Sequence, residues 1–218
     1  MQAHSRKRIA NAQQRSWPHP AVVGGFFILL IMLQMLAPAA LGPFAQSPRP
    51  SVQSCLACTE SSDLDACHRL AMQLSERNDH LAAITIEERI HALRPDDPEV
   101  AAALARMHHI GRNDTIRAIA LYHAALGARS GYAPALFGLG NIFEEKGDLD
   151  IAEGYFSRGS REHPNMAAFK VRLAAVLVDA GRDLEAGPVL NEILARWPDS
   201  DEAHLARRLL DRTALARP

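Results

Sequence analysis

The sequence predicts an all-α protein: a solenoid of about four helical hairpins with a C-terminal capping helix, behind a single N-terminal transmembrane helix. Three observations support this fold class. The chain of 218 residues is 48% hydrophobic but only 6% aromatic, a balance that favours helices over strands. Small, apolar and turn-forming residues return about every 34 residues between positions 64 and 200. Residues 21–45 contain no charged side chain.

The uncharged segment at residues 21–45 is long enough to cross a membrane. About 20 apolar residues span a bilayer core as a helix, and residues 21–40 reach this length. The basic segment 1–20 precedes it, so the positive-inside rule predicts a cytoplasmic N-terminus. The rest of the chain is then expected on the periplasmic side of the inner (plasma) membrane. A cleaved secretory signal, with a loose small-x-small site at residues 37–39, and a buried core helix remain alternatives.

Residues 46–63 are predicted to form a spacer between this segment and the folded part of the chain. Pro48 and Pro50 lie within it. Proline cannot continue a helix, and it stiffens an extended chain. The spacer also contains a C-x-x-C motif at Cys55 and Cys58.

The chain beyond residue 45 is acidic, although the net charge of the whole chain is only −1. Four basic residues and no acidic one precede residue 46, so the remainder carries 20 Lys and Arg against 25 Asp and Glu. Proteins that bind nucleic acid need clustered positive charge to displace counterions from the phosphates. We therefore expect no nucleic-acid partner.

The repeat is clearest in residues 133–166. Gly140 and Ala152 are small enough to let two helices of a hairpin approach closely, and Gly147 suits the left-handed cap of the first helix. Gly138 is expected to lie on another face, away from this contact. The complete pattern consists of Leu139, Gly140, Phe143, Gly147, Ala152, Phe156 and Pro164. This pattern resembles that of the tetratricopeptide repeat (TPR) family.

Residues 167–200 and 64–97 match the same pattern in phase. The first of these stretches keeps the turn glycine, at Gly181, and the closing proline. In the second, Asn78 takes the place of the turn glycine, and Glu87 stands where an aromatic side chain is usual.

Residues 98–132 form a fourth, less regular unit that is one residue longer and has no closing proline. Its turn glycine is expected at Gly111, and its tail is similar to that of Sel1-like relatives of the family. The resemblance thus covers residues 64–200. Residues 201–218 are expected to form a capping helix and tail, with Leu205 and Leu209 facing inward, because terminal repeats need a polar outer face.

Three cysteines, Cys55, Cys58 and Cys67, are candidates for a disulfide. A C-x-x-C motif supports redox exchange when it opens a helix beside a strand, and no strand is expected here. Outside the cytoplasm a structural disulfide would join Cys67 to Cys55 or Cys58 and fasten the spacer to the first repeat. An unpaired or intermolecular thiol, and a redox or metal-binding role, remain alternatives.

No motif in the sequence predicts catalysis. A nucleophile elbow, a phosphate-binding loop and a dinucleotide-binding glycine pattern are all missing. The chain has ten histidines, but His91, His123 and His163 belong to different predicted hairpins, so four metal ligands are not expected to converge. We expect no enzyme activity, no metal, no cofactor and no small-molecule substrate.

The TPR resemblance implies that the first helices of the hairpins line a concave surface that binds protein segments. The residues at the matching inner positions are Asp65, His68, Met72, Glu76, Glu99, Arg106, His109, Phe137, Asn141, Glu144, Glu145, Val171, Ala175, Val178 and Asp179. Phe137 has no partner assigned within the solenoid, so we expect it to anchor a ligand. The acidic and apolar side chains of this set favour a partner segment with basic and apolar residues.

These features together predict a membrane-anchored TPR protein that is a protein-binding scaffold or assembly factor for a cell-envelope complex. The membrane would be contacted through residues 21–45. One alternative is a secreted periplasmic TPR adaptor, released by signal cleavage. Another is a thiol–disulfide or cytochrome c maturation factor that uses the C-x-x-C motif.

Overall fold

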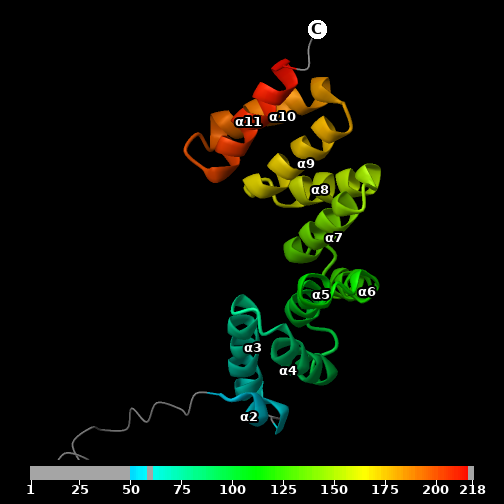
Figure 1. Cartoon of the computed structure of the whole chain (residues 1–218), viewed down its shortest axis with the longest axis vertical. Coiled ribbons are helices and arrows are strands. Elements are labelled where there is room, and N and C mark those ends of the chain that lie inside the picture. The colour runs from blue at the N-terminus through cyan, green and yellow to red at the C-terminus, as the bar shows by residue number, and fades with distance from the viewer. Residues whose placement is uncertain (1–49, 58–60, 216–218) are drawn as a thin grey trace, which may run out of the picture. The chain divides into compact units, whose positions relative to one another are not determined.

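The computed structural model of the chain describes residues 50–57 and 61–215. In this part of the chain it contains ten helices and no strand (Figure 1). None of the described helices is long and apolar enough to cross a membrane. The predicted membrane segment at residues 21–45 and Cys58 lie outside the described residues.

Eight of the helices form four consecutive hairpins within the compact unit Pro50–Pro218 (Figure 1). The first helix of each hairpin is α3 (Ser61–Glu76), α5 (Pro98–Arg112), α7 (Ala133–Glu145) or α9 (Ala167–Asp179). The second helix is α4 (His80–Leu93), α6 (Thr115–Ala128), α8 (Leu149–Glu162) or α10 (Asp183–Arg196). Each helix packs against the next one in the chain, as the predicted all-helical solenoid requires.

The remaining two helices close the ends of this stack. The short helix α2 (Val52–Ala57) packs against α3 and α4, and α11 (Asp201–Leu215) packs against α9 and α10. Leu209 of α11 is buried, whereas Arg207, Arg208 and Arg212 are exposed. The helix therefore has the apolar inner side and polar outer side predicted for a cap.

Each hairpin turns at one residue with a positive φ angle. These residues are Asn78, Asn113, Gly147 and Gly181, with φ values of 64°, 54°, 80° and 72°. Glycine and asparagine are the residues that adopt this left-handed conformation most readily. A residue in this conformation ends the first helix of each hairpin.

The predicted turn at Gly111 is wrong. Gly111 lies inside α5, where a Cβ atom would come 2.5 Å from the Cβ of His80, and the chain turns two residues later at Asn113. The glycine therefore allows close packing between α5 and the start of α4. The extra residue of this unit lies within α5. The Sel1-like character expected for the unit is not confirmed.

The core lies between the two helices of each hairpin and between successive hairpins. One position of the second helix, held by Glu87, Tyr122, Phe156 and Leu190, is buried in all four hairpins. In the first hairpin this position carries a carboxylate in place of an apolar side chain, with 0% of its surface exposed. Burying a charge is unfavourable unless it is paired, so Glu87 needs a partner inside the protein.

Candidate protein-binding groove

The first helices of the first three hairpins enclose a groove with two parts that share Arg106, Tyr122 and Pro134. The wider part has a volume of about 410 Å³ and lies between α5, α7 and the start of α9. It is lined by Arg106, His109, Ile110, Tyr122, Ala133, Pro134, Phe137, Gly138, Asn141, Glu145, Met166 and Ala168. The narrower part, of about 180 Å³, lies between α3 and α5. It is lined by His68, Met72, Glu99, Ala102, Ala103, Arg106, Tyr122, Tyr132 and Pro134.

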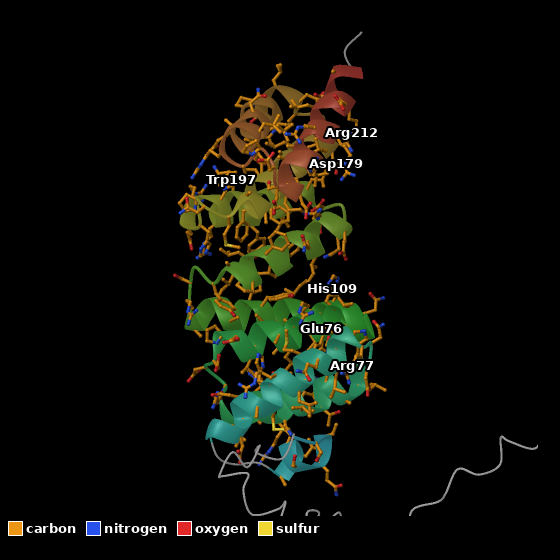
Figure 2. All side chains as sticks on the ribbon, turned by 90° about the vertical axis from the view of Figure 1, so that its left-hand side faces the viewer. Glu76, Arg77, His109, Asp179, Trp197 and Arg212 are labelled. Atoms are coloured by element: carbon orange, nitrogen blue, oxygen red, sulfur yellow. A yellow bond between two sulfur atoms is a disulfide. The ribbon has the colours of Figure 1, made fainter. Side chains whose placement is uncertain are left out.

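Eight of the fifteen predicted groove residues line this groove. They are His68, Met72, Glu99, Arg106, His109, Phe137, Asn141 and Glu145. They come from three different hairpins, and the phase of the repeat placed them on one face. Figure 2 shows His109 of α5 on the side of the molecule that faces the viewer.

The fourth hairpin does not contribute an open inner face, which corrects the sequence-based prediction. Val171, Ala175 and Val178 are buried, with 4%, 9% and 8% of their surface exposed, in a cluster with Leu209 of α11. The capping helix covers this face because its apolar side needs an apolar surface to pack on. The three residues therefore belong to the core and are not available to a partner.

Four further predicted residues, all carboxylates, lie outside the groove. Asp65 forms an ion pair with Arg94 at 2.7 Å. Glu144 pairs with Arg172 of α9. Asp179 pairs with Arg212 of the capping helix, and both residues are labelled in Figure 2. Glu76, near the C-terminal end of α3, has no ion pair among the described residues.

Phe137 is part of an aromatic cluster, which corrects the expectation that it has no partner. Its ring meets those of Phe156 and Phe169 edge-on, with centroids 5.7 and 5.4 Å apart. Edge-to-face pairs at such distances are favourable for aromatic rings. Phe137 nevertheless lines the wider part of the groove. Its ring is thus a fixed part of the groove wall and not a mobile anchor.

Tyr122, which was not predicted as a groove residue, lines both parts of the groove although it belongs to the second helix α6. It reaches the groove across Gly138 of α7, where a Cβ atom would lie 2.5 Å from the tyrosine hydroxyl oxygen. Burial raises the pKa of Tyr122 to about 12, so its hydroxyl is protonated at neutral pH. Gly138 lies next to the repeat-pattern residue Leu139, and a glycine there leaves room for an aromatic side chain from the preceding hairpin, which is the signal that could have indicated this contact.

The buried carboxylate of Glu87 is paired with His68, whose Nδ1 lies 2.7 Å from its Oε1. Burial raises the pKa of Glu87, and the hydrogen bond to Glu87 raises the pKa of His68. The other ring nitrogen of His68 lies 3.8 Å from Glu99. The histidine therefore links the interior of the first hairpin to the narrower part of the groove.

Arg106 lies where the two parts of the groove meet. It has no carboxylate partner among the described residues, and its Nη2 donates to the sulfur of Met72 at 3.3 Å. By contrast, the groove carboxylate Glu145 is already engaged by His109 at 3.0 Å.

The N-terminal end of the solenoid carries the only cysteine pairing among the described residues. The sulfur atoms of Cys55 in α2 and Cys67 in α3 are bonded, and both residues are buried. Among the described residues, no group of three or more His, Cys, Asp and Glu side chains could hold a metal ion.

This arrangement defines a class of protein: a helical-repeat protein whose stacked hairpins present a concave groove and whose far end is closed by a cap. The tetratricopeptide repeat model matches residues 107–159 and 137–201, which supports the assignment of the third and fourth hairpins, and of part of the second, to that repeat. Comparison with curated protein sequences gives no significant match.

Several solved structures share this fold. PilF of Pseudomonas aeruginosa superposes with a TM-score of 0.61 at 19% identity, over 69% of this chain and 69% of that one. MamA of Desulfovibrio magneticus RS-1 gives 0.58 at 15% identity, over 69% and 85%. The Yersinia enterocolitica type III secretion chaperone SycD, in complex with a peptide of the translocator YopD, gives 0.51 at 16% identity, over 56% and 97%. At these identities the likeness establishes the fold alone.

Proposed function

We propose that this chain is a membrane-anchored scaffold or assembly factor for a cell-envelope complex, and that it binds a segment of a partner protein in its groove. The observation that carries the proposal is the contrast between the hairpins. The inner face of the fourth hairpin is covered by α11, whereas the groove at the first three has an aromatic wall and is covered by no described part of the chain.

The shape and lining of the groove fit a polypeptide ligand. Its two parts lie side by side along successive hairpins, so an extended or helical segment could occupy both. Phe137 and Met166 provide large apolar side chains in the groove, and contacts of this kind commonly contribute most of the affinity at protein interfaces. The SycD structure holds a peptide of another protein, so a fold of this kind is able to bind one.

The partner segment predicted from the sequence has basic and apolar residues. The apolar part of this proposal is supported by the groove wall. The basic part can involve only a few carboxylates, because Glu144, Glu145 and Asp179 already contact basic side chains of the chain. Glu76 is the predicted carboxylate that could meet a basic residue of the partner without breaking an ion pair.

The membrane anchor and the periplasmic location rest on the sequence alone. Residues 21–45 are uncharged and follow a basic segment, which supports an inner-membrane span with the repeats on the periplasmic side. A secreted periplasmic adaptor differs from this proposal only by cleavage of the segment. The mass of the mature protein distinguishes the two.

A thiol–disulfide role is not our proposal. Cys55 is bonded to Cys67 and has 0% of its surface exposed, so its sulfur cannot be reached by a substrate thiol. We propose instead that the cysteines have a structural role, in which the bond fastens α2 to the first repeat in an oxidising compartment.

Site-specific photo-crosslinking in intact cells tests whether the groove is the working surface. A photoreactive amino acid replaces Met166 in the groove or, as a control, Ile151 outside it, where the exposed fractions are similar at 43% and 46%. We expect discrete adducts with a partner protein from position 166 and none from position 151. Adducts at both positions, or at position 151 alone, would place the partner on another surface.

A further inference from the structure

Some charged side chains of the groove already have an oppositely charged or histidine partner within the protein, and others do not. Glu145 lies 3.0 Å from His109, and Glu99 lies 3.8 Å from His68. Arg106 has no such partner in the described part of the chain. The buried carboxylate of Glu87 is engaged by His68 at 2.7 Å.

The surroundings of Arg106 leave most of its hydrogen-bonding groups without an acceptor. A guanidinium group carries five N–H donors in a planar fork, and the thioether of Met72 is a weak acceptor. The side chain is partly buried in a groove whose other walls include the rings of Tyr122 and Tyr132 and the ring of Pro134. An arginine in such a site is suited to bind a carboxylate through two parallel hydrogen bonds.

We infer that Arg106 binds a side-chain carboxylate of the partner segment, next to a large apolar side chain that enters the wider part of the groove. The inference rests on the proposed function, since it names the chemistry of the segment that the groove would hold. Charge complementarity carries it, because the arginine is the one cation that lines the groove without a carboxylate partner among the described residues. An acidic residue of the ligand would satisfy it without breaking an ion pair of the protein.

The position of Arg106 also predicts the order of residues along the ligand. It belongs to both parts of the groove, and the wider part contains Phe137 and Met166 on the α7 and α9 side. The acidic residue of the ligand is therefore expected within a few residues of its apolar anchor. Glu76 lies outside both parts, so any basic residue of the same segment is expected at the α3 end.

Selection from a random peptide library tests the inference. Random dodecamers displayed at the N-terminus of a phage coat protein have no free carboxyl terminus, so any acidic preference reports side chains. The bait is the full chain, purified in detergent. We expect the parent protein to enrich sequences in which Asp or Glu lies close to a large apolar residue. Synthetic peptides of that kind should bind Arg106→Gln about ten- to a hundredfold more weakly.

A matched control separates this site from general charge effects. Arg112 lies in the same helix, is exposed and lines neither part of the groove, so Arg112→Gln should select the same sequences as the parent. Arg106→Glu should reverse the preference from acidic to basic residues. If that variant does not fold, as judged by its circular dichroism, the milder Arg106→Gln decides the question.

The outcomes distinguish this inference from the proposed function. Enrichment of apolar peptides without acidic residues, or an acidic preference that persists in Arg106→Gln, would overturn the role of Arg106 and leave a peptide-binding groove. Failure to enrich any sequence would count against the proposed function itself, and the inference would fall with it.

Discussion

Replacing Gly159 in α8 by alanine tests the packing behind the groove. A Cβ atom at this position would lie less than 3 Å from three ring atoms of Phe169, with Cζ at 2.7 Å. The ring cannot easily move away, because Phe169 is fully buried, stacks on His163 and meets Phe137 edge-on at 5.4 Å. We therefore expect Gly159→Ala to be destabilised by overpacking.

Gly154 provides a control within the same helix. A Cβ atom there would meet no atom within 4 Å. Both substitutions gain helix propensity of about 0.5–1 kcal/mol over glycine, so this contribution cancels when the two variants are compared. The difference between them then equals the overpacking term, about 1–3 kcal/mol. In a protein of this size each kcal/mol shifts the melting temperature by about 2–4 °C.

The assay is thermal and urea-induced unfolding of both variants, followed by far-ultraviolet circular dichroism. Gly154→Ala is expected to melt slightly above the parent, and Gly159→Ala about 2–12 °C below Gly154→Ala. Equal melting temperatures for the two variants would refute the close approach of Gly159 to Phe169. They would also remove the support that Phe169 gives to Phe137 in the groove wall.

Three other predictions concern the two ends of the solenoid. Because folding raises the pKa values of both His68 and Glu87, the folded protein holds their protons more tightly than the unfolded chain does. The contribution of Glu87 to stability is full only below about pH 4.5, and that of His68 is full below about pH 6.5. Each contribution is lost as the pH rises through the folded pKa of its own group, so the unfolding free energy of the parent relative to Glu87→Gln should fall as the pH rises above about 4.5 and fall further above about 6.5; a relative stability that rises with pH would contradict the pairing. Leu209→Ala should lower the unfolding free energy by about 2–5 kcal/mol, since it opens a cavity under the capping helix, and an unchanged value would mean that α11 is not docked. Cys67→Ser should lower it by about 3 kcal/mol under oxidising conditions and by little in a reductant, whereas three free thiols in protein from its native compartment would rule out the bond to Cys55.

The repeat phase was predictable because it depends on residues with a steric role. Gly140 was expected at a close helix contact, and a Cβ atom there would lie 2.5 Å from the ring of Phe156. Asn78 was expected to replace a turn glycine, and it has a positive φ. Only a few side chains fit such positions, so the sequence identifies them.

Contacts between helices were less predictable, because they depend on which side chain reaches across. Gly138 was expected on a face without close packing, yet Tyr122 of the preceding hairpin lies against it. The pairing of Glu87 with His68 and of Glu144 with Arg172 involves long side chains from different helices. Their partners cannot be derived from spacing along one helix.

The residues of an inner face themselves indicate whether that face is free. The inner positions of α9 carry Val171, Ala175 and Val178, which would form an exposed apolar patch if nothing covered them, and α11 does cover them. At the corresponding level of α5, Arg106 and His109 are polar and remain partly exposed. The capping helix therefore needs only apolar contacts to dock on its face. The face with Arg106 also offers hydrogen-bond donors beside aromatic rings, a combination that is common at protein interfaces. The difference between the two faces supports the proposal that a partner binds at the first three hairpins, and the carboxylate preference proposed for Arg106 is a direct test of it.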